Sequence, residues 1–128
     1  MKNWSVHFYF DEDFSWKSLE KAFTEIFDIV KGEKKLLPEE EQQIQVKYEL
    51  NMREINNNKK PIGFYSDQTD LSLLFPLEVK EMIVARLSPN ENIHEIGDRI
   101  SKVLKTKKIK FKMDYDKMIL IDVIKSRK

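Results

Sequence analysis

The segment 44–52 alternates apolar and polar residues without interruption, and its apolar positions are Ile44, Val46, Tyr48, Leu50 and Met52. Because successive side chains of a strand point to opposite faces, this alternation predicts a strand with one buried face and one solvated face. Such a strand belongs to a sheet that is covered on one side only, and two helical patterns elsewhere in the chain can supply the cover. The segment therefore predicts a one-sided sheet packed against helices.

The length and composition of the chain predict a single domain over residues 1–128. A chain of 128 residues has the usual size of one domain, and 41% apolar residues are enough to build a core. The apolar stretch near the N-terminus is too short and too aromatic for a signal peptide, and every apolar run is far shorter than the ~20 residues needed to span a membrane. We therefore expect a cytoplasmic protein. Its richness in Lys, Ile and Asn is associated with a bacterial or phage source.

The chain up to residue 87 predicts a strand, a helix and three further strands. The strand covers 4–10, and the helix follows with Ser15 as its N-cap, an apolar stripe ending at Val30, and Gly32 as its left-handed terminator. The strand at 44–55 is followed by an asparagine-rich loop and by a short strand over 62–65. The segment 77–87 is interpreted as a strand, and a helix starting at Pro76 is the competing interpretation.

The chain after residue 87 predicts a helix and a closing hairpin. A capping box at 88–91, with Pro89 at the first helical position, announces a helix whose apolar stripe includes Gly97, and this glycine predicts close helix–sheet contact. The apolar runs 109–113 and 118–124, joined through 114–117, predict the hairpin. The order β-α-β-β-β-α-β-β predicts an α+β fold with an antiparallel sheet of about five to six strands and two helices on one face. It resembles ferredoxin-like modules with an added strand, and this resemblance in fold implies no function.

Few side chains are available for catalysis or for binding a cofactor. The chain has no cysteine, which excludes disulfides, thiolate metal sites and cysteine nucleophiles. His7 and His94 lack a second ligand at metal-binding spacing, so we expect each to be a surface or edge histidine. The adjacent carboxylates Asp11, Glu12 and Asp13 are typical of a solvated approach to a helix rather than of a metal site. We therefore expect no enzyme activity, no cofactor and no metal.

Carboxylates and large aromatic side chains gather where the first strand meets the first helix. This acidic–aromatic corner comprises Tyr9, Asp11, Glu12, Asp13, Phe14 and Trp16. Aromatic residues are enriched at protein–protein hot spots, and carboxylates steer a basic partner surface. In an alternative interpretation, Phe14 and Trp16 only close the core. The corner favours a small non-enzymatic protein-binding module that acts stoichiometrically on a larger protein, such as an inhibitor, an immunity protein or a phage-encoded antagonist.

Seven basic residues follow one another without an intervening acid. This lysine-rich stripe comprises Arg99, Lys102, Lys105, Lys107, Lys108, Lys110 and Lys112. Strand alternation over 108–112 would place three ammonium groups on one face, where they can neutralise phosphates without reading a base sequence. Lysines also line exposed edge strands, where they discourage edge-to-edge pairing. A nucleic-acid-binding accessory protein is therefore the alternative function.

The apolar run near the C-terminus predicts self-association. The segment from Ile119 to Ile124 is interrupted only by Asp122, so a strand there would be apolar on both faces. One face of the sheet of a monomer should be polar. We therefore expect a homodimer that forms through a self-complementary two-fold contact.

Overall fold

The computed structural model describes residues 3–66, 69–88 and 91–116. Its elements are, in order, β1 (Ser5–Tyr9), the short 3-10 helix η1 (Trp16–Leu19), α1 (Glu20–Lys31), α2 (Pro38–Asn56), β2 (Leu71–Leu74), β3 (Glu81–Arg86), α3 (Ile93–Thr106) and β4 (Lys112–Tyr115). The strands form one antiparallel sheet in the order β2-β3-β1-β4. The predicted α+β class and antiparallel sheet are confirmed. The described residues contain four strands and three α-helices, in place of five to six strands and two helices.

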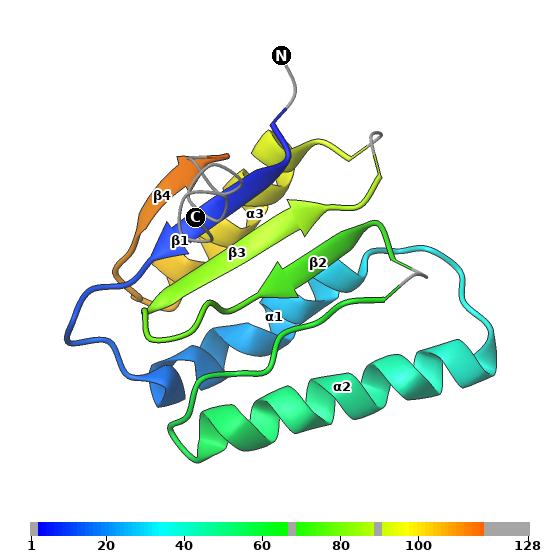
Figure 1. Ribbon diagram of the computed structural model, residues 1–128, viewed down its shortest axis with the longest axis horizontal. Coiled ribbons are helices and arrows are strands. Elements are labelled where there is room, and N and C mark those ends of the chain that lie inside the picture. Colours follow the sequence, from blue (N-terminus) through cyan, green and yellow to red (C-terminus); the bar gives the residue numbers. More distant parts are fainter. Residues whose placement is uncertain (1–2, 67–68, 89–90, 117–128) are drawn as a thin grey trace, which may run out of the picture.

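The helices lie in two different relations to the sheet. α1 and α3 lie side by side on one face, and α2 runs along the β2 side of the molecule, where it packs against α1 and η1 (Figure 1). Without α2, the remaining elements have the β-α-β-β-α-β order and the sheet arrangement of the ferredoxin-like fold. The element added to that fold is therefore a helix, not the strand that the sequence predicts.

The segment 44–52 lies inside α2, so the strand predicted there is wrong. Val46 and Leu50 are 51% and 37% exposed, whereas Ile44, Asn51 and Ile55 are buried at helical spacing. The start of the helix carries Pro38 and three glutamates in its first turn, and the Glu40 carboxylate accepts a hydrogen bond from the Leu37 backbone N–H at 2.8 Å. These first-turn features satisfy the free N–H groups of a helix and suit its dipole.

The N-terminal strand and helix agree with the sequence. Val6 and Phe8 of β1 are fully buried, and so is Phe23 of α1. Gly32 ends α1 with a φ of +74°, and its N–H donates to the Asp28 carbonyl at 3.0 Å. The predicted N-cap, Ser15, precedes η1 rather than α1. Its side chain hydrogen-bonds the Ser18 hydroxyl at 2.8 Å instead of capping the helix.

The second half of the chain requires several corrections. The strand interpretation of 77–87 holds for β3, while 77–80 form the turn before it. The Asn92 side chain caps α3 by accepting from the His94 and Glu95 N–H groups at 3.0 and 3.2 Å, so the helix does not begin at Ser88. The predicted strand over 62–65 is reduced to one bridge between Phe64 and Leu73.

The last described strand, β4, begins at Lys112, and it includes Asp114 and Tyr115, which the sequence assigns to a turn. The partner strand of the predicted hairpin, 118–124, lies outside the described residues, as does the apolar run on which the homodimer prediction rests. Gly97 confirms the close helix–sheet contact, because a Cβ atom there would lie 2.8 Å from the Tyr115 hydroxyl and 3.3 Å from Val6.

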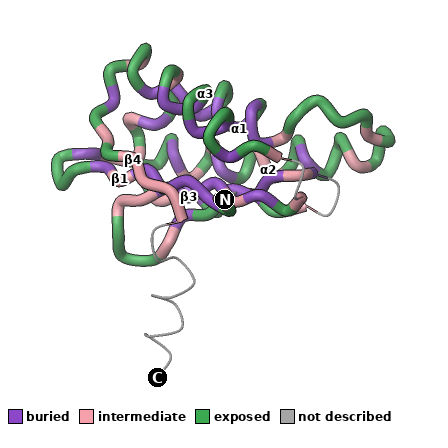
Figure 2. Tube along the Cα trace, turned by 90° about the horizontal axis from the view of Figure 1, so that it is seen from above, coloured by how far each residue is buried: buried purple, intermediate pink, exposed green. Residues whose placement is uncertain are grey.

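The two faces of the sheet carry different side chains. Val6, Phe8, Met82 and Val84 share the face toward α1 and α3, and all four are fully buried. Figure 2 shows these helices on one side of β1, β3 and β4. The opposite face carries His7 and Ile83 instead. Among the described residues, no helix is both long enough and apolar enough to cross a membrane.

Candidate functional site

The structure separates the aromatic residues of the acidic–aromatic corner from its acids. Phe14 is buried, with its ring stacked on Phe10 at 4.1 Å between centroids. Trp16 meets Phe14 and Phe75 edge-on at 5.3 and 5.6 Å. Both rings therefore close one end of the core, as in the alternative interpretation. Tyr9 lies on the sheet, where its ring stacks on His7 at 5.9 Å.

The carboxylates of the corner stay exposed, and they adjoin exposed apolar side chains that the sequence pattern does not predict. Asp11, Glu12 and Asp13 are solvent-exposed. Beside them is the β2–β3 turn, residues 75–80, which we call the hairpin tip. Here Leu77 is 79% exposed and Val79 is 46% exposed. A strand over 77–87 would place Leu77 and Val79 inside the sheet, so that prediction does not reveal the exposed turn.

Three local features fix the shape of the hairpin tip. Glu78 has a φ of +64°, a conformation typical of tight turns. The Lys80 ammonium donates to the Glu12 carbonyl, and the Phe10 N–H donates to the Lys80 carbonyl at 2.9 Å. The hairpin tip and the segment 11–13, which we call the acidic loop, are therefore held together as one surface at the same end of the molecule (Figure 1).

The lysine-rich stripe does not form the predicted strand face. Lys112 lies in β4, whereas Lys108 lies in a turn with a φ of +61° and Lys110 lies in the loop that follows. The Lys107 ammonium pairs with the Glu25 carboxylate at 3.3 Å. A shallow cavity of about 260 Å³ brings Asp11 and Asp13 together with basic residues, namely Lys21, Lys108 and Lys110. Carboxylates therefore interrupt the basic surface.

His7 is buried, which corrects the prediction of a surface or edge histidine. Its Nδ1 lies 2.7 Å from Glu81 Oε1, and its Nε2 lies 3.4 Å from Ser5 Oγ. The order serine–histidine–carboxylate is that of a hydrolase triad. However, Ser5 and His7 are only 1% and 3% exposed, so the serine oxygen is not accessible to a substrate. The three side chains form a buried hydrogen-bonded network. His94 is exposed, as predicted, and its ring packs on Tyr115 at 4.1 Å.

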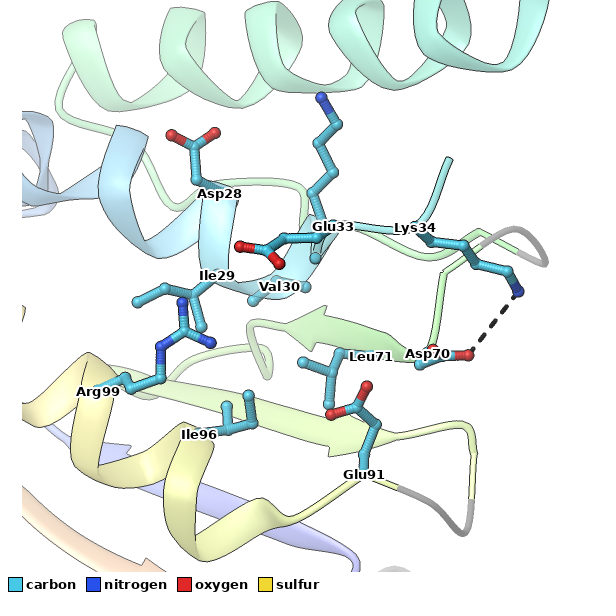
Figure 3. A pocket seen from close by; sticks show the side chains of 12 residues that line it. Asp28, Ile29, Val30, Glu33, Lys34, Asp70, Leu71, Glu91, Ile96 and Arg99 are labelled. Carbon is cyan, nitrogen blue, oxygen red and sulfur yellow. Dashed lines mark ion pairs between the residues drawn. The ribbon is translucent and has the colours of Figure 1, made fainter. Parts of the chain in front are cut away.

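A larger cavity, of about 680 Å³, opens between the C-terminal end of α1 and the face of α3. We call it the α1–α3 cavity. Its floor is apolar and consists of Ile29, Val30, Leu71 and Ile96. Its rim carries charges of both signs, contributed by Asp28, Lys31, Glu33, Lys34, Asp70, Glu91 and Arg99. Figure 3 shows Glu33, Glu91 and Arg99 around the floor, while the Lys34 ammonium is turned away toward Asp70, 4.0 Å from its carboxylate.

Three charged side chains of this rim lie near the floor, and two of them, Glu33 and Arg99, are solvent-exposed. The ion pairs formed within the described part of the chain do not use Glu33, Glu91 or Arg99. Partial burial raises the pKa of Glu91, as do the neighbouring carboxylates of Asp70 and Glu95, while Arg99 acts in the opposite direction. Among these side chains only Arg99 belongs to a candidate site predicted from the sequence, because a cavity that joins α1, α3 and β2 has no local sequence signature.

The arrangement of side chains supplies no ready-made metal centre. Across 3–66, 69–88 and 91–116, no three histidine or carboxylate side chains converge closely enough to hold a metal ion. No protein-family model, curated protein or solved structure matches this chain. The hairpin tip, the acidic loop and the α1–α3 cavity are therefore the candidate functional surfaces.

Proposed function

We propose that the protein is a non-enzymatic binding module that occupies a surface of a larger protein through the hairpin tip and the acidic loop. The observation that carries this proposal is Leu77, which is 79% exposed in the β2–β3 turn beside three exposed carboxylates. Inhibitors, immunity proteins and phage-encoded antagonists act stoichiometrically in this way.

The geometry of the hairpin tip suits insertion into an apolar pocket. The turn is fixed by the conformation of Glu78 and by the bond from Lys80 to the acidic loop. A surface that is ordered before binding loses less conformational entropy when it binds. The carboxylates of Asp11, Glu12 and Asp13 would steer a basic rim around that pocket and favour the correct orientation. The partner expected from this chemistry is a protein with an apolar pocket bordered by lysine or arginine.

The nucleic-acid alternative has weaker support. Exposed lysines remain on α3 and in the loop after it, but Lys107 is paired with Glu25, and acidic residues share a cavity with Lys108 and Lys110. A continuous basic surface is the usual footprint of phosphate binding. We therefore favour a protein partner.

The test is affinity capture from a lysate of the source cells with three baits. These are the unmodified protein, Leu77→Asp, and Leu37→Asp as a matched control, because Leu37 is a leucine that is 62% exposed at the start of α2. We expect the unmodified protein and the Leu37 variant to retain the same partner, and the Leu77 variant to lose it. Equal recovery of that partner with all three baits would contradict the proposal.

A salt series distinguishes the two functions. Capture through the hairpin tip should persist at high salt, because it depends on apolar contact. Binding through phosphates falls with roughly one power of the salt concentration per contact. Nucleic acid in the eluate, lost steeply as salt rises, would support the lysine-rich stripe and contradict the protein-binding proposal.

A further inference from the structure

The α1–α3 cavity combines an apolar floor with a charged rim. Its floor residues, Ile29, Val30, Leu71 and Ile96, are at most 8% exposed, so the floor is part of the ordered core. Its volume of about 680 Å³ lies within the range of roughly 300–1,000 Å³ that is usual for ligand pockets. In a pocket of this kind the apolar floor contributes affinity, and the polar groups around it fix the orientation of the ligand.

The polar groups around this floor carry opposite charges and come from α1, α3 and the segments beside them. Figure 3 shows the Arg99 guanidinium beside Ile29 and the Glu91 carboxylate beside Leu71, with the Glu33 carboxylate between α1 and the floor. Within the described residues, none of these three side chains takes part in an ion pair. A guanidinium binds a carboxylate in a two-pronged geometry, and a carboxylate binds an ammonium group.

A ligand with a single charge would use only part of this rim. An amine alone would make no charge-assisted contact with Arg99, and a carboxylate alone would make none with Glu33 or Glu91. The pKa of Glu91 is raised by partial burial and by Asp70 and Glu95, so a positive group beside it would relieve an existing excess of negative charge.

We propose that the α1–α3 cavity binds a zwitterion of the α-amino-acid type with an apolar side chain. The carboxylate of the ligand would bind Arg99, its ammonium group would bind Glu33 and Glu91, and its side chain would lie on the apolar floor. This site lies apart from the hairpin tip and does not depend on the proposed protein-binding function.

The test uses leucine as the probe and the methyl signals of Ile29 and Ile96 in NMR titrations as the readout. We expect saturable shifts of both methyl groups with leucine. Isoamylamine and 4-methylpentanoate, which each lack one of the two charged groups of leucine, should bind at least about tenfold more weakly, since each forfeits a charge-assisted contact. The Leu77→Asp variant should bind leucine normally, so the two proposals can fail separately.

Two pairs of matched variants assign the roles of the charged side chains. Arg99→Gln and Glu91→Gln should each weaken leucine binding at least about tenfold. Arg53→Gln and Glu49→Gln remove the same charges from exposed positions of α2 and should leave binding unchanged. The proposal is overturned if leucine produces no saturable shift, if the amine or the acid binds as tightly as leucine, or if Arg99→Gln binds leucine like the unmodified protein.

Discussion

The helices α3 and α2 are held to the molecule in different ways. α3 buries a broad stripe against the sheet and α1, formed by Ile93, Ile96, Gly97, Ile100, Ser101 and Leu104. α2 is the longer helix, but it buries only Ile44, Asn51 and Ile55, and it lies beside α1 and η1 at the margin of the fold (Figure 1). The length of a helix therefore says little about its attachment, which depends on the surface that it buries.

Polar contacts complement the narrow apolar contact of α2. The Asn51 amide nitrogen donates to the carbonyls of Lys47 and Gly63 at 2.8 and 2.9 Å, and its oxygen accepts from the Gly63 N–H at 2.7 Å. The hydroxyls of Tyr48 and Thr24 are 2.6 Å apart. We therefore expect α3 to be most sensitive to the loss of apolar volume, and α2 to be most sensitive to the loss of one buried amide.

The largest effect is expected at the centre of α3. Ile100 is fully buried, so Ile100→Ala should lower the free energy of unfolding by about 2–5 kcal/mol, through lost burial and the cavity left behind. Chemical denaturation measures this change. Lys102→Ala, on the exposed side of the same helix, is the control and should change stability by less than about 0.5 kcal/mol. Similar losses for the two variants would show that α3 is not packed as described.

The next effect concerns the amide that attaches α2. Asn51→Ala leaves the Gly63 N–H and carbonyl without their partner, which should cost about 1–3 kcal/mol. Asn56→Ala, at an exposed position of the same helix, should cost much less. If denaturation midpoints fall equally in the two variants, the hydrogen bonds of the Asn51 amide contribute no more to stability than an exposed asparagine does.

A smaller effect is expected at the helix caps, where the two helices also differ. Asn92→Ala removes the side chain that accepts from the first turn of α3 and should cost about 1 kcal/mol. α2 has Leu37 at the equivalent position, and no polar side chain is lost if that residue is replaced. A thermal melt of Asn92→Ala that coincides with that of the unmodified protein would show that the Asn92 side chain does not stabilise the start of α3.

The smallest effect is expected on the outer face of α2. Leu50→Lys should change stability by less than about 0.5 kcal/mol and leave the helical circular dichroism signal intact, because Leu50 is 37% exposed and a lysine there can extend its ammonium group into solvent. A strand over 44–52 would bury Leu50, and the same substitution would then abolish folding. Tyr48→Lys should cost more than Leu50→Lys, because Tyr48 packs against Phe23 and Phe27.

The sequence could predict α1 and α3, but it could not identify α2 by alternation alone. Ile44, Tyr48 and Met52 are spaced four apart, and this spacing fits both the period of a strand and one face of a helix. The residues that distinguish the two patterns are Leu50, which is apolar yet exposed, and Asn51, which is polar yet 1% exposed. Neither state follows from residue type, because both depend on what the rest of the chain places beside the helix.

The candidate site was less predictable than the fold. The acidic loop was identified as a group because its three carboxylates are adjacent in sequence. The α1–α3 cavity has no local signature, because Glu33, Glu91 and Arg99 meet only after α1 and α3 are packed together. The exposed position of Leu77 is hard to predict for a different reason. Alternation through 77–87 does not show where the turn ends and the strand begins.

The position of β1 in the sheet has a consequence for the order of folding during synthesis. β1 is the earliest described strand to leave the ribosome, yet Val6 pairs with Val84 of β3 and with Tyr115 of β4, which emerge last. The apolar side of β1 therefore stays unprotected until most of the chain has been translated. Such long-range pairing slows folding and prolongs exposure to aggregation. Val6, Phe8 and Phe10 are thus the residues that a chaperone acting on the nascent chain would protect.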